Sequence, residues 1–188
     1  MKLSKLAAGA AIVSSLAVTA LAHGGATGIV KERMDGMGVM KQSMKVLTPM
    51  MQGKTPYDAS VIRNEAEKIG GHAGEALTKL FPEGTHGKPS EARPEIWNDW
   101  DGFAGLAEQL RAVSEGLVLA ADNGMMTTDA GQGTSLMGGS MMGSGMMGSS
   151  TMMGKVPSEK ELSEMPADGV FMMLSQTCSA CHTRFRAE

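Results

Sequence analysis

The chain has 188 residues, the length of a single domain, and a formal net charge of −3 at pH 7. This mild acidity argues against nucleic acid as a partner, since proteins that bind nucleic acid carry basic surfaces. Aromatic residues make up only 4% of the chain and Met occurs 19 times, so a core must be built from Leu, Ala, Val and Met. Such a core gains from a large apolar prosthetic group at its centre.

The first 22 residues have the pattern of a secretory signal peptide. Lys2 and Lys5 precede an apolar stretch at 6–18, and Ala20-Leu21-Ala22 is a small-x-small cleavage site. The stretch is too short and too rich in alanine for a confident membrane span, although an uncleaved anchor is the alternative. Cleavage would leave a mature domain of residues 23–188 and move the formal charge from −3 to −5. We therefore expect export to the periplasm, with no stable membrane insertion afterwards.

A first amphipathic helix is predicted over residues 26–51, where inward positions recur at alternating steps of four and three. One inward position is Arg33, and a charge on an apolar face either extends to the surface or has an anionic partner. Pro49 and Gly53 are expected to end or bend this helix near Thr48.

A second helix is predicted to begin at Thr55-Pro56, an N-cap followed by a proline at the first helical position. Pro82 and Gly84 are expected to end it, and the following stretch as far as Pro94 is predicted to be a loop. Its inward stripe consists of Ile62, Ala66, Ile69, Ala73, Ala76 and Leu80.

The last two predicted helices complete the fold. Asn123-Gly124 is expected to end the third helix. The fourth is predicted to begin at Pro166 and reach Phe185, after a short helical turn with the capping-box pair Ser158 and Glu161. Four amphipathic helices with mostly short loops predict an all-α fold, an antiparallel up-down-up-down four-helix bundle. The inward stripe of the third helix is Ile96, Trp100, Phe103, Ala107, Leu110, Ser114, Leu117 and Ala121.

The last helix carries the segment Cys178-Ser179-Ala180-Cys181-His182. The pattern C-x-x-C-H attaches c-type haem: each thiol forms a thioether with a vinyl group, and the histidine ligates the iron. C-x-x-C also occurs in thioredoxin-like and zinc sites, but the sequence shows neither a βαβ context nor a second Cys or His pair. These are the only two cysteines. We therefore predict one covalently bound haem c, held in the bundle core because both cysteines lie on the inward stripe.

With haem attached to the last helix of a four-helix bundle, the chain resembles the cytochrome c′ family. The C-terminal match is the most specific, with an aromatic residue three positions and an arginine four positions after His182. The matching residues are Arg33-x-x-x-Met37, Leu80-Phe81-Pro82-Glu83-Gly84, Pro94-Glu95-Ile96-Trp97 with Phe103, and Cys178-Ser179-Ala180-Cys181-His182-Thr183-Arg184-Phe185-Arg186.

The resemblance implies roles for three further residues. Arg33 would contact a haem propionate, Met37 would pack over the distal haem face, and Arg186 would border His182. It also implies a periplasmic protein, commonly a homodimer. Some members have five-coordinate iron that admits NO or CO, and others have low-spin iron with a first-helix Met as sixth ligand. Met37 fits either pattern, as an apolar lid or as a thioether ligand, so both alternatives stay open.

One departure from the family pattern is a Met-, Gly- and Ser-rich insertion at residues 124–156, between the third and fourth helices. Its glycine content does not sustain a helix, so it is predicted to be a flexible loop. Clustered thioethers are soft ligands that suit Cu(I). The alternatives are an unstructured linker and a sacrificial buffer against oxidation. The candidate copper ligands are Met141, Met142, Met146, Met147, Met152 and Met153.

Two classes of function are therefore expected. The first is a haem protein that passes single electrons to redox partner proteins, binds NO or CO at a five-coordinate haem, or does both; a low-spin His/Met electron carrier is its variant. The second is a copper-handling protein that uses the Met-rich loop. No acid–base cluster accompanies the haem motif beyond Arg33, so no catalytic residue is assigned and no enzyme is predicted. Without its cofactor, the bundle is expected to show a cavity between the first, third and fourth helices.

Overall fold

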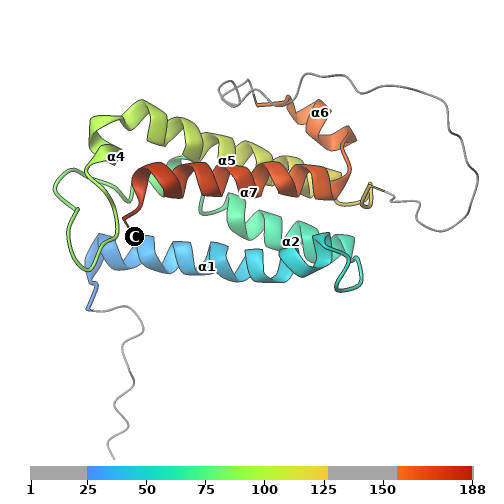
Figure 1. The fold of residues 1–188 in the computed structure, drawn as a ribbon, viewed down its shortest axis with the longest axis horizontal. Coiled ribbons are helices and arrows are strands. Elements are labelled where there is room, and N and C mark those ends of the chain that lie inside the picture. The colour runs from blue at the N-terminus through green and yellow to red at the C-terminus, as the bar shows by residue number, and fades with distance from the viewer. Residues whose placement is uncertain (1–24, 127–155, 188) are drawn as a thin grey trace, which may run out of the picture.

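The computed structural model describes residues 25–126 and 156–187. This part of the chain forms helices without a named strand, and Ala92 and Arg186 form an isolated bridge. The long helices lie side by side in alternating directions, which confirms the all-α antiparallel bundle (Figure 1). The helices are α1 Gly28–Met51, α2 Ala59–Gly70, α3 Glu75–Thr78, α4 Glu95–Asn98, α5 Trp100–Ala120, α6 Glu159–Glu164 and α7 Ala167–Phe185. None of them is both long enough and apolar enough to span a membrane.

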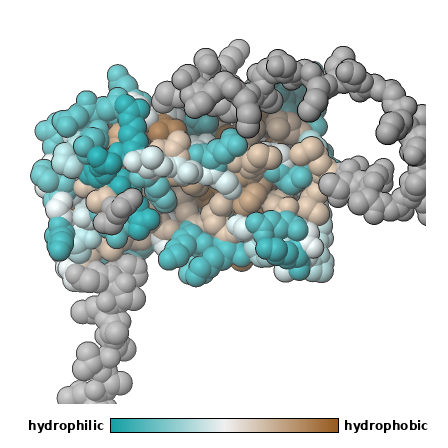
Figure 2. All heavy atoms as spheres, in the orientation of Figure 1, coloured by the Kyte–Doolittle hydropathy of each residue, from teal (hydrophilic) through white to brown (hydrophobic). Residues whose placement is uncertain are grey.

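Helix α5 is the centre of the packing, since it contacts α2, α6 and α7 extensively. Helix α1 packs mainly on α2 and makes few contacts with α7. Apolar surface gathers over part of α7 on the face seen in Figure 2, with hydrophilic residues along α1 below it. The lower edge of the bundle is therefore more polar than its middle.

The buried apolar residues divide into two clusters. The main core joins α1, α2, α5, α6 and α7, and its most deeply buried members are Leu47, Ile62, Ala66, Val113, Leu117, Ala120, Ala121, Ala167, Val170 and Leu174. The aromatic cluster joins α3, α4, the beginning of α5 and the end of α7. It consists of Leu77, Leu80, Phe81, Ile96, Phe103, Leu106, Ala107 and Phe185.

Helix α1 ends at Met51, as predicted, although Pro49 lies inside it. A proline removes one backbone donor and disturbs the preceding turn. Here it lies in the last turn of the helix, where little of the hydrogen-bond ladder remains to be lost. The end is closed by Gln52 and Gly53, whose N–H groups donate to Thr48 O at 3.1 Å and Met50 O at 3.0 Å. The helix therefore continues a short way past Thr48, the residue near which Pro49 and Gly53 were expected to end or bend it.

The start of the second helix also differs from the prediction. Asp58, and not Thr55, is the N-cap of α2, because its Oδ1 accepts from the N–H groups of Ser60 at 2.9 Å and Val61 at 3.1 Å. A carboxylate is a strong acceptor for the unpaired donors of a first helical turn. Its pKa is accordingly lowered, first by the Ser60 hydroxyl and then by the two N–H groups.

The predicted second helix is in fact two helices, separated by residues 71–74. Gly74 has φ 55 and donates its N–H to Ala107 O on α5 at 2.9 Å. A Cβ at this position would lie 2.9 Å from Arg111 Cδ, so only glycine allows this close approach. The predicted inward positions on both sides of the break are nevertheless buried, as Ala73 and Leu80 show.

The predicted third helix is interrupted at Asp99, which separates α4 from α5. The Asp99 carboxylate fills the space above Gly102, where a Cβ would lie 2.1 Å from Oδ2, and it forms an ion pair with Arg184 of α7 at 2.5 Å. The interruption turns Trp100 to the surface, where 40% of it is exposed. Its predicted inward position is therefore wrong, whereas Phe103 is buried as expected.

The predicted capping box at Ser158 and Glu161 is confirmed at the start of α6, and α7 begins at Ala167, directly after Pro166. Asn123 Nδ2 donates to the backbone oxygens of Ser163 and Met165, each at 2.7 Å. The chain on both sides of the Met-rich segment is thus fixed at the N-terminal end of α7. Residues 1–22 and the six candidate copper ligands lie outside the described residues.

Candidate haem site

The two cysteine side chains lie where the two apolar clusters meet. Cys178 packs against the main core and Cys181 against the aromatic cluster. Burial raises the pKa of Cys178; it also raises that of Cys181 to about 11, with a smaller contribution from Cys178. Both groups are therefore neutral thiols at neutral pH. A redox-active C-x-x-C site has a lowered thiol pKa instead, so this environment does not suit thioredoxin-like chemistry.

A zinc site is disfavoured as well. In the described ranges 25–126 and 156–187, no group of three or more His, Cys, Asp or Glu side chains could hold a metal ion. Structural zinc sites need four such ligands. Cys178 and Cys181 are both free cysteines.

His182 is exposed one position after Cys181, near the end of α7. Its pKa is lowered, mainly by partial loss of hydration and then by the positive charge of Arg186, while Glu91 acts in the opposite direction. A lowered pKa keeps the imidazole neutral, which is the form that ligates a metal. Arg186 is held near it by an ion pair from its Nε to Glu91 Oε2 at 2.6 Å. The structure thus brings the two residues into the same neighbourhood.

Arg33 is the most unusual charged residue of the bundle, with only 4% of it exposed. Its guanidinium carbon lies 4.4 Å from the centroid of the Phe81 ring, and its Nη2 donates to Thr85 O at 2.7 Å. Within the described residues, the buried Nε has no hydrogen-bond partner, and no ion pair to this guanidinium is found. Burial also lowers the pKa of the group.

A buried cation without an anionic partner is costly. Arg33 contacts Phe81, and Phe81 belongs to the same cluster against which Cys181 packs. A carboxylate brought to this end of the bundle would satisfy the guanidinium. The residues present therefore fit an apolar cofactor that carries a carboxylate and is attached through thiols, as haem c is.

Met37 lies one helical turn after Arg33 and packs against both apolar clusters. It therefore faces the region that also contains Cys181. The rings of Phe81 and Phe185 pack edge-on against Phe103, with centroid distances of 4.8 and 5.5 Å. These rings were not assigned to the site from the sequence. The sequence did place Phe103 and Phe185 at inward positions. Periodicity alone, however, does not distinguish side chains that surround a cofactor from side chains of an ordinary core.

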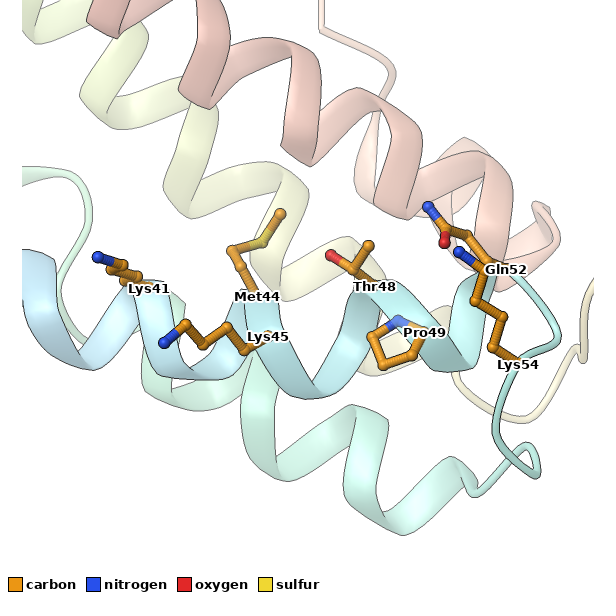
Figure 3. Close-up of a pocket in the computed structure, with 7 residues that line it drawn as sticks. All are labelled: Lys41, Met44, Lys45, Thr48, Pro49, Gln52 and Lys54. Carbon is orange, nitrogen blue, oxygen red and sulfur yellow. The ribbon is translucent and has the colours of Figure 1, made fainter.

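Two pockets of the described part of the chain can be compared with the expected cavity between α1, α5 and α7. The larger pocket, about 500 Å³, follows α1 and is lined by Lys41, Met44, Lys45, Thr48, Pro49, Gln52 and Lys54 (Figure 3). The other is lined by Phe81, Pro82, Glu83, Trp97 and Trp100. Neither is lined by the thiols or by His182. Neither of these two pockets is therefore the expected cavity, which stays a prediction.

Comparison with known proteins identifies the family of the chain. The family model of cytochrome c′ matches residues 28–138, which end before the C-x-x-C-H segment. Cytochrome c′ of Alcaligenes xylosoxydans xylosoxydans is 32% identical over 99 residues, 50% of this chain and 72% of that protein. Cytochrome c-556 of Agrobacterium tumefaciens (strain II Chrys) is 34% identical over 95 residues, covering 48% of this chain and 76% of that protein.

Solved structures share the fold. Cytochrome c′ of Rhodopseudomonas palustris superposes with a TM-score of 0.58 at 19% identity, over 87% of this chain and 98% of that one. The nitric oxide complex of a cytochrome c′ mutant from Alcaligenes xylosoxidans gives a TM-score of 0.56 at 22% identity, over 85% and 94% of the two chains. The chain therefore belongs to the cytochrome c′ family, four-helix bundles that bind covalently attached haem c.

Proposed function

We propose that Cys178 and Cys181 hold one haem c through thioethers and that His182 is the axial ligand of its iron. The observation that carries this proposal is the buried guanidinium of Arg33, which lacks a carboxylate among the described residues at the end of the bundle that holds the thiols. In this arrangement Arg33 binds a haem propionate and the aromatic cluster keeps water from the porphyrin. The bound haem supplies an iron that exchanges one electron and binds small ligands.

The iron is proposed to be five-coordinate, with Met37 as an apolar lid on the distal side. A methionine among apolar side chains is more often a packing residue than a ligand, and Met37 packs against both clusters. A crowded apolar distal side admits a small diatomic ligand, and the related Alcaligenes xylosoxidans mutant has been solved with nitric oxide. The proposed function is therefore single-electron transfer to redox partner proteins, binding of NO or CO, or both.

The visible spectrum of the reduced protein, recorded before and after CO addition, tests this coordination. We expect a high-spin spectrum that changes when CO binds. A low-spin spectrum unaffected by CO would support the alternative in which Met37 is the sixth ligand. Met37→Leu should then convert the protein to a CO-binding form, whereas Met34→Leu on the same helix serves as the control for a general change in packing.

We also propose that residues 1–22 are a signal peptide and that residues 23–188 form one periplasmic domain. The support is the pattern of two lysines, an apolar stretch and Ala20-Leu21-Ala22. The exported protein should begin at His23, which mass spectrometry of the N-terminal peptide would establish. A homodimer is expected from the resemblance to other members, and sedimentation of the haem-loaded protein would measure it.

Copper handling is the second candidate function, supported by the recurring methionine pairs between residues 125 and 153. The chain that leads into this segment is held against the start of α7, since Met126 N–H donates to Asp168 Oδ1 at 3.0 Å and Ala167 N–H donates to Gly124 O at 2.8 Å. Deletion of residues 137–153 should therefore leave the bundle intact. If the methionines bind copper, the deletion abolishes Cu(I) binding measured against a competing chelator; unchanged affinity would refute the proposal.

A further inference from the structure

The C-terminal end of α7 is joined by backbone hydrogen bonds to the loop that precedes α4. Arg93 N–H donates to Phe185 O at 3.0 Å. Ala187 N–H donates to Glu91 O at 2.8 Å, and the isolated bridge at Arg186 lies between these two bonds. Figure 1 shows the end of α7 beside this loop. The backbone at Arg186 therefore has a fixed place relative to Glu91.

The backbone also fixes Arg186 relative to His182. Arg186 is the C-cap residue of α7, and its N–H donates to His182 O at 3.1 Å. One helical turn thus separates the two residues, whereas Glu91 belongs to the loop. In agreement with this arrangement, Arg186 has the larger effect on the pKa of His182 and Glu91 a smaller, opposite one. Of these two charged residues, Arg186 has the direct connection to the proposed axial ligand.

The side chain of Arg186 is held by Glu91. The Arg186 Nε donates to Glu91 Oε2 at 2.6 Å, and the two side chains are 53% and 58% exposed. In the part of the chain that the structure describes, no second hydrogen bond or ion pair of this guanidinium is found. An exposed pair adds little to the stability of a fold. Without its partner, however, a long side chain regains its rotamers and extends into water.

The neighbouring Arg184 does not depend on a single contact. Its guanidinium forms an ion pair with Asp99 and also lies over the Phe185 ring, 5.2 Å from the centroid. The backbone bonds at Arg93 and Ala187 likewise need no charge on Glu91. Removal of the Glu91 carboxylate should therefore release the Arg186 side chain and leave the end of α7 in place.

We propose that Glu91 is a positioning residue that holds the positive charge of Arg186 beside the axial ligand and thereby raises the reduction potential of the iron. A nearby positive charge favours the reduced iron, which carries one positive charge less. Residues that surround a ligand tune the metal in this way without touching it. The inference rests on the proposed haem function and adds to it a residue outside the helices.

The test is the reduction potential of the exported, haem-loaded protein and its Glu91→Gln variant, measured by redox titration. The variant should have a lower potential, although it loses a negative charge, because the released guanidinium moves into water. We expect the equilibrium constant of reduction to fall roughly 1.5- to 5-fold, the range of an exposed charge pair. This fall corresponds to roughly 10–40 mV for one electron. If Glu91 acted only as a nearby charge, the potential would rise, and a rise or an unchanged value would overturn the proposal.

A double variant separates positioning from a general disturbance of the haem site. Arg186→Gln alone should lower the potential, and in this background there is no guanidinium for Glu91 to hold. The further change Glu91→Gln should therefore cause no further fall. A further fall would show that Glu91 acts by another route and would contradict the proposal.

The matched control is Asp122→Asn, which breaks the exposed ion pair with Arg63. Asp122 follows α5, close to the start of α7 and away from His182. The potential of this variant should equal that of the unmodified protein. A fall as large as that of Glu91→Gln would overturn the proposal, since the loss of any surface pair would then suffice.

Failure of this inference can be distinguished from failure of the proposed function. Unmodified protein without covalent haem would refute both. If haem is present, the visible spectrum of Glu91→Gln should equal that of the unmodified protein, so that only the potential changes. A changed spin state in this variant would show that His182 itself is displaced. Glu91 would then have a structural role, and the positioning of Arg186 would be contradicted while the haem assignment stands.

Discussion

The main core and the aromatic cluster differ in how their buried polar groups are paired. In the main core, Ser43 Oγ donates to Glu65 Oε2, Ser114 Oγ to Leu110 O and Thr177 Oγ1 to Met173 O, at 2.7, 2.7 and 2.9 Å. At the aromatic cluster, the buried Arg33 keeps an Nε without a partner among the described residues. Cys181 is half-buried there, in surroundings that favour the neutral thiol over the thiolate.

In the proposed assignment, this difference separates a part of the bundle that stabilises the fold from a part that would bind the cofactor. Buried polar groups in proteins are nearly always hydrogen-bonded, so an exception needs a physical cause. In the main core the buried hydroxyl groups of Ser43, Ser114 and Thr177 are hydrogen-bonded, so no such cause is required there. The aromatic cluster combines an unpaired cation with the neutral thiol of Cys181, and Cys178 lies beside it against the main core. The proposed haem, with its propionate and vinyl groups, would account for the cation and for both thiols. Substitutions in the two parts should therefore have different consequences.

The largest effect is expected from replacing both thiols. Cys178→Ala together with Cys181→Ala removes both thioether bonds, so the protein should lose all haem that resists acidified acetone. Absorbance of the protein pellet after extraction measures this. Ser179→Ala, between the two cysteines, is the control and should retain the pigment. Haem that stays attached in the double variant would contradict the assignment.

A substitution in the main core should lower stability and leave the haem in place. Leu117 is fully buried, and Leu117→Ala should reduce the free energy of unfolding by roughly 2–5 kcal/mol through lost burial and the resulting cavity. Leu119 lies on the same helix with 46% of it exposed. Leu119→Ala should change stability by no more than about 0.5 kcal/mol. Thermal unfolding, with the visible spectrum as a check on haem, compares the two.

A similar test applies to the close contact between α5 and α6. A Cβ at Gly116 would lie 2.7 Å from Leu162 Cβ, so Gly116→Ala should force the helices apart. Overpacking of this kind costs about 1–3 kcal/mol. Gly105→Ala is the matched control, since no atom lies within 4 Å of its added Cβ. Equal stability of the two variants would show that α6 is not packed on α5 as described.

Arg33→Gln should affect the haem-loaded protein more than the haem-free protein. Loss of a hydrogen-bonded, charged partner of the propionate should cost about 1.5–3 kcal/mol when haem is bound. The reduction potential should also fall, because removal of a nearby positive charge favours the oxidised iron. Arg63→Gln, which removes an exposed partner of Asp122, is the control. Equal effects with and without haem would rule out contact between Arg33 and the cofactor.

The smallest predicted effect is a pH-dependent one at Ser43. Burial alone would raise the pKa of Glu65, but hydrogen bonds from Lys68 and Ser43 outweigh it and the pKa is lowered. The stabilisation is therefore present above the ordinary glutamate pKa and is lost as the pH falls through the lowered value. Ser43→Ala should cost about 1 kcal/mol at neutral pH. Urea unfolding between pH 7 and pH 3 should show this difference shrinking towards low pH.

Much of the fold could be predicted from sequence because the apolar positions follow a helical period. The inward positions of α1, α2 and α5 were identified from spacing alone, and Ile62, Ala66 and Ile69 are buried as expected. The break at residues 71–74 was missed because the period continues through it. At the break, Gly74 donates its N–H to Ala107 O, and a Cβ added to Gly74 would lie close to Arg111 Cδ; both residues are distant in sequence.

In the candidate site, too, residues with a fixed local spacing were predicted, whereas residues brought together by tertiary contacts were not. The cysteines and His182 are recognisable because covalent haem attachment requires a fixed local spacing. The position of Trp100 was predicted wrongly, since Asp99 interrupts the helix by pairing with Arg184 on α7. The contact of Arg33 with Phe81 and Thr85 spans about fifty residues of chain. Spacing along one helix holds no information about such tertiary contacts.

The most direct test of the central claim is the mass of the denatured, exported protein. If Cys178 and Cys181 carry thioether bonds, the intact mass exceeds that of the polypeptide by one haem, and a peptide that contains both cysteines carries the whole difference. A polypeptide mass without this addition, in protein that was exported by a host able to attach haem, would contradict the account.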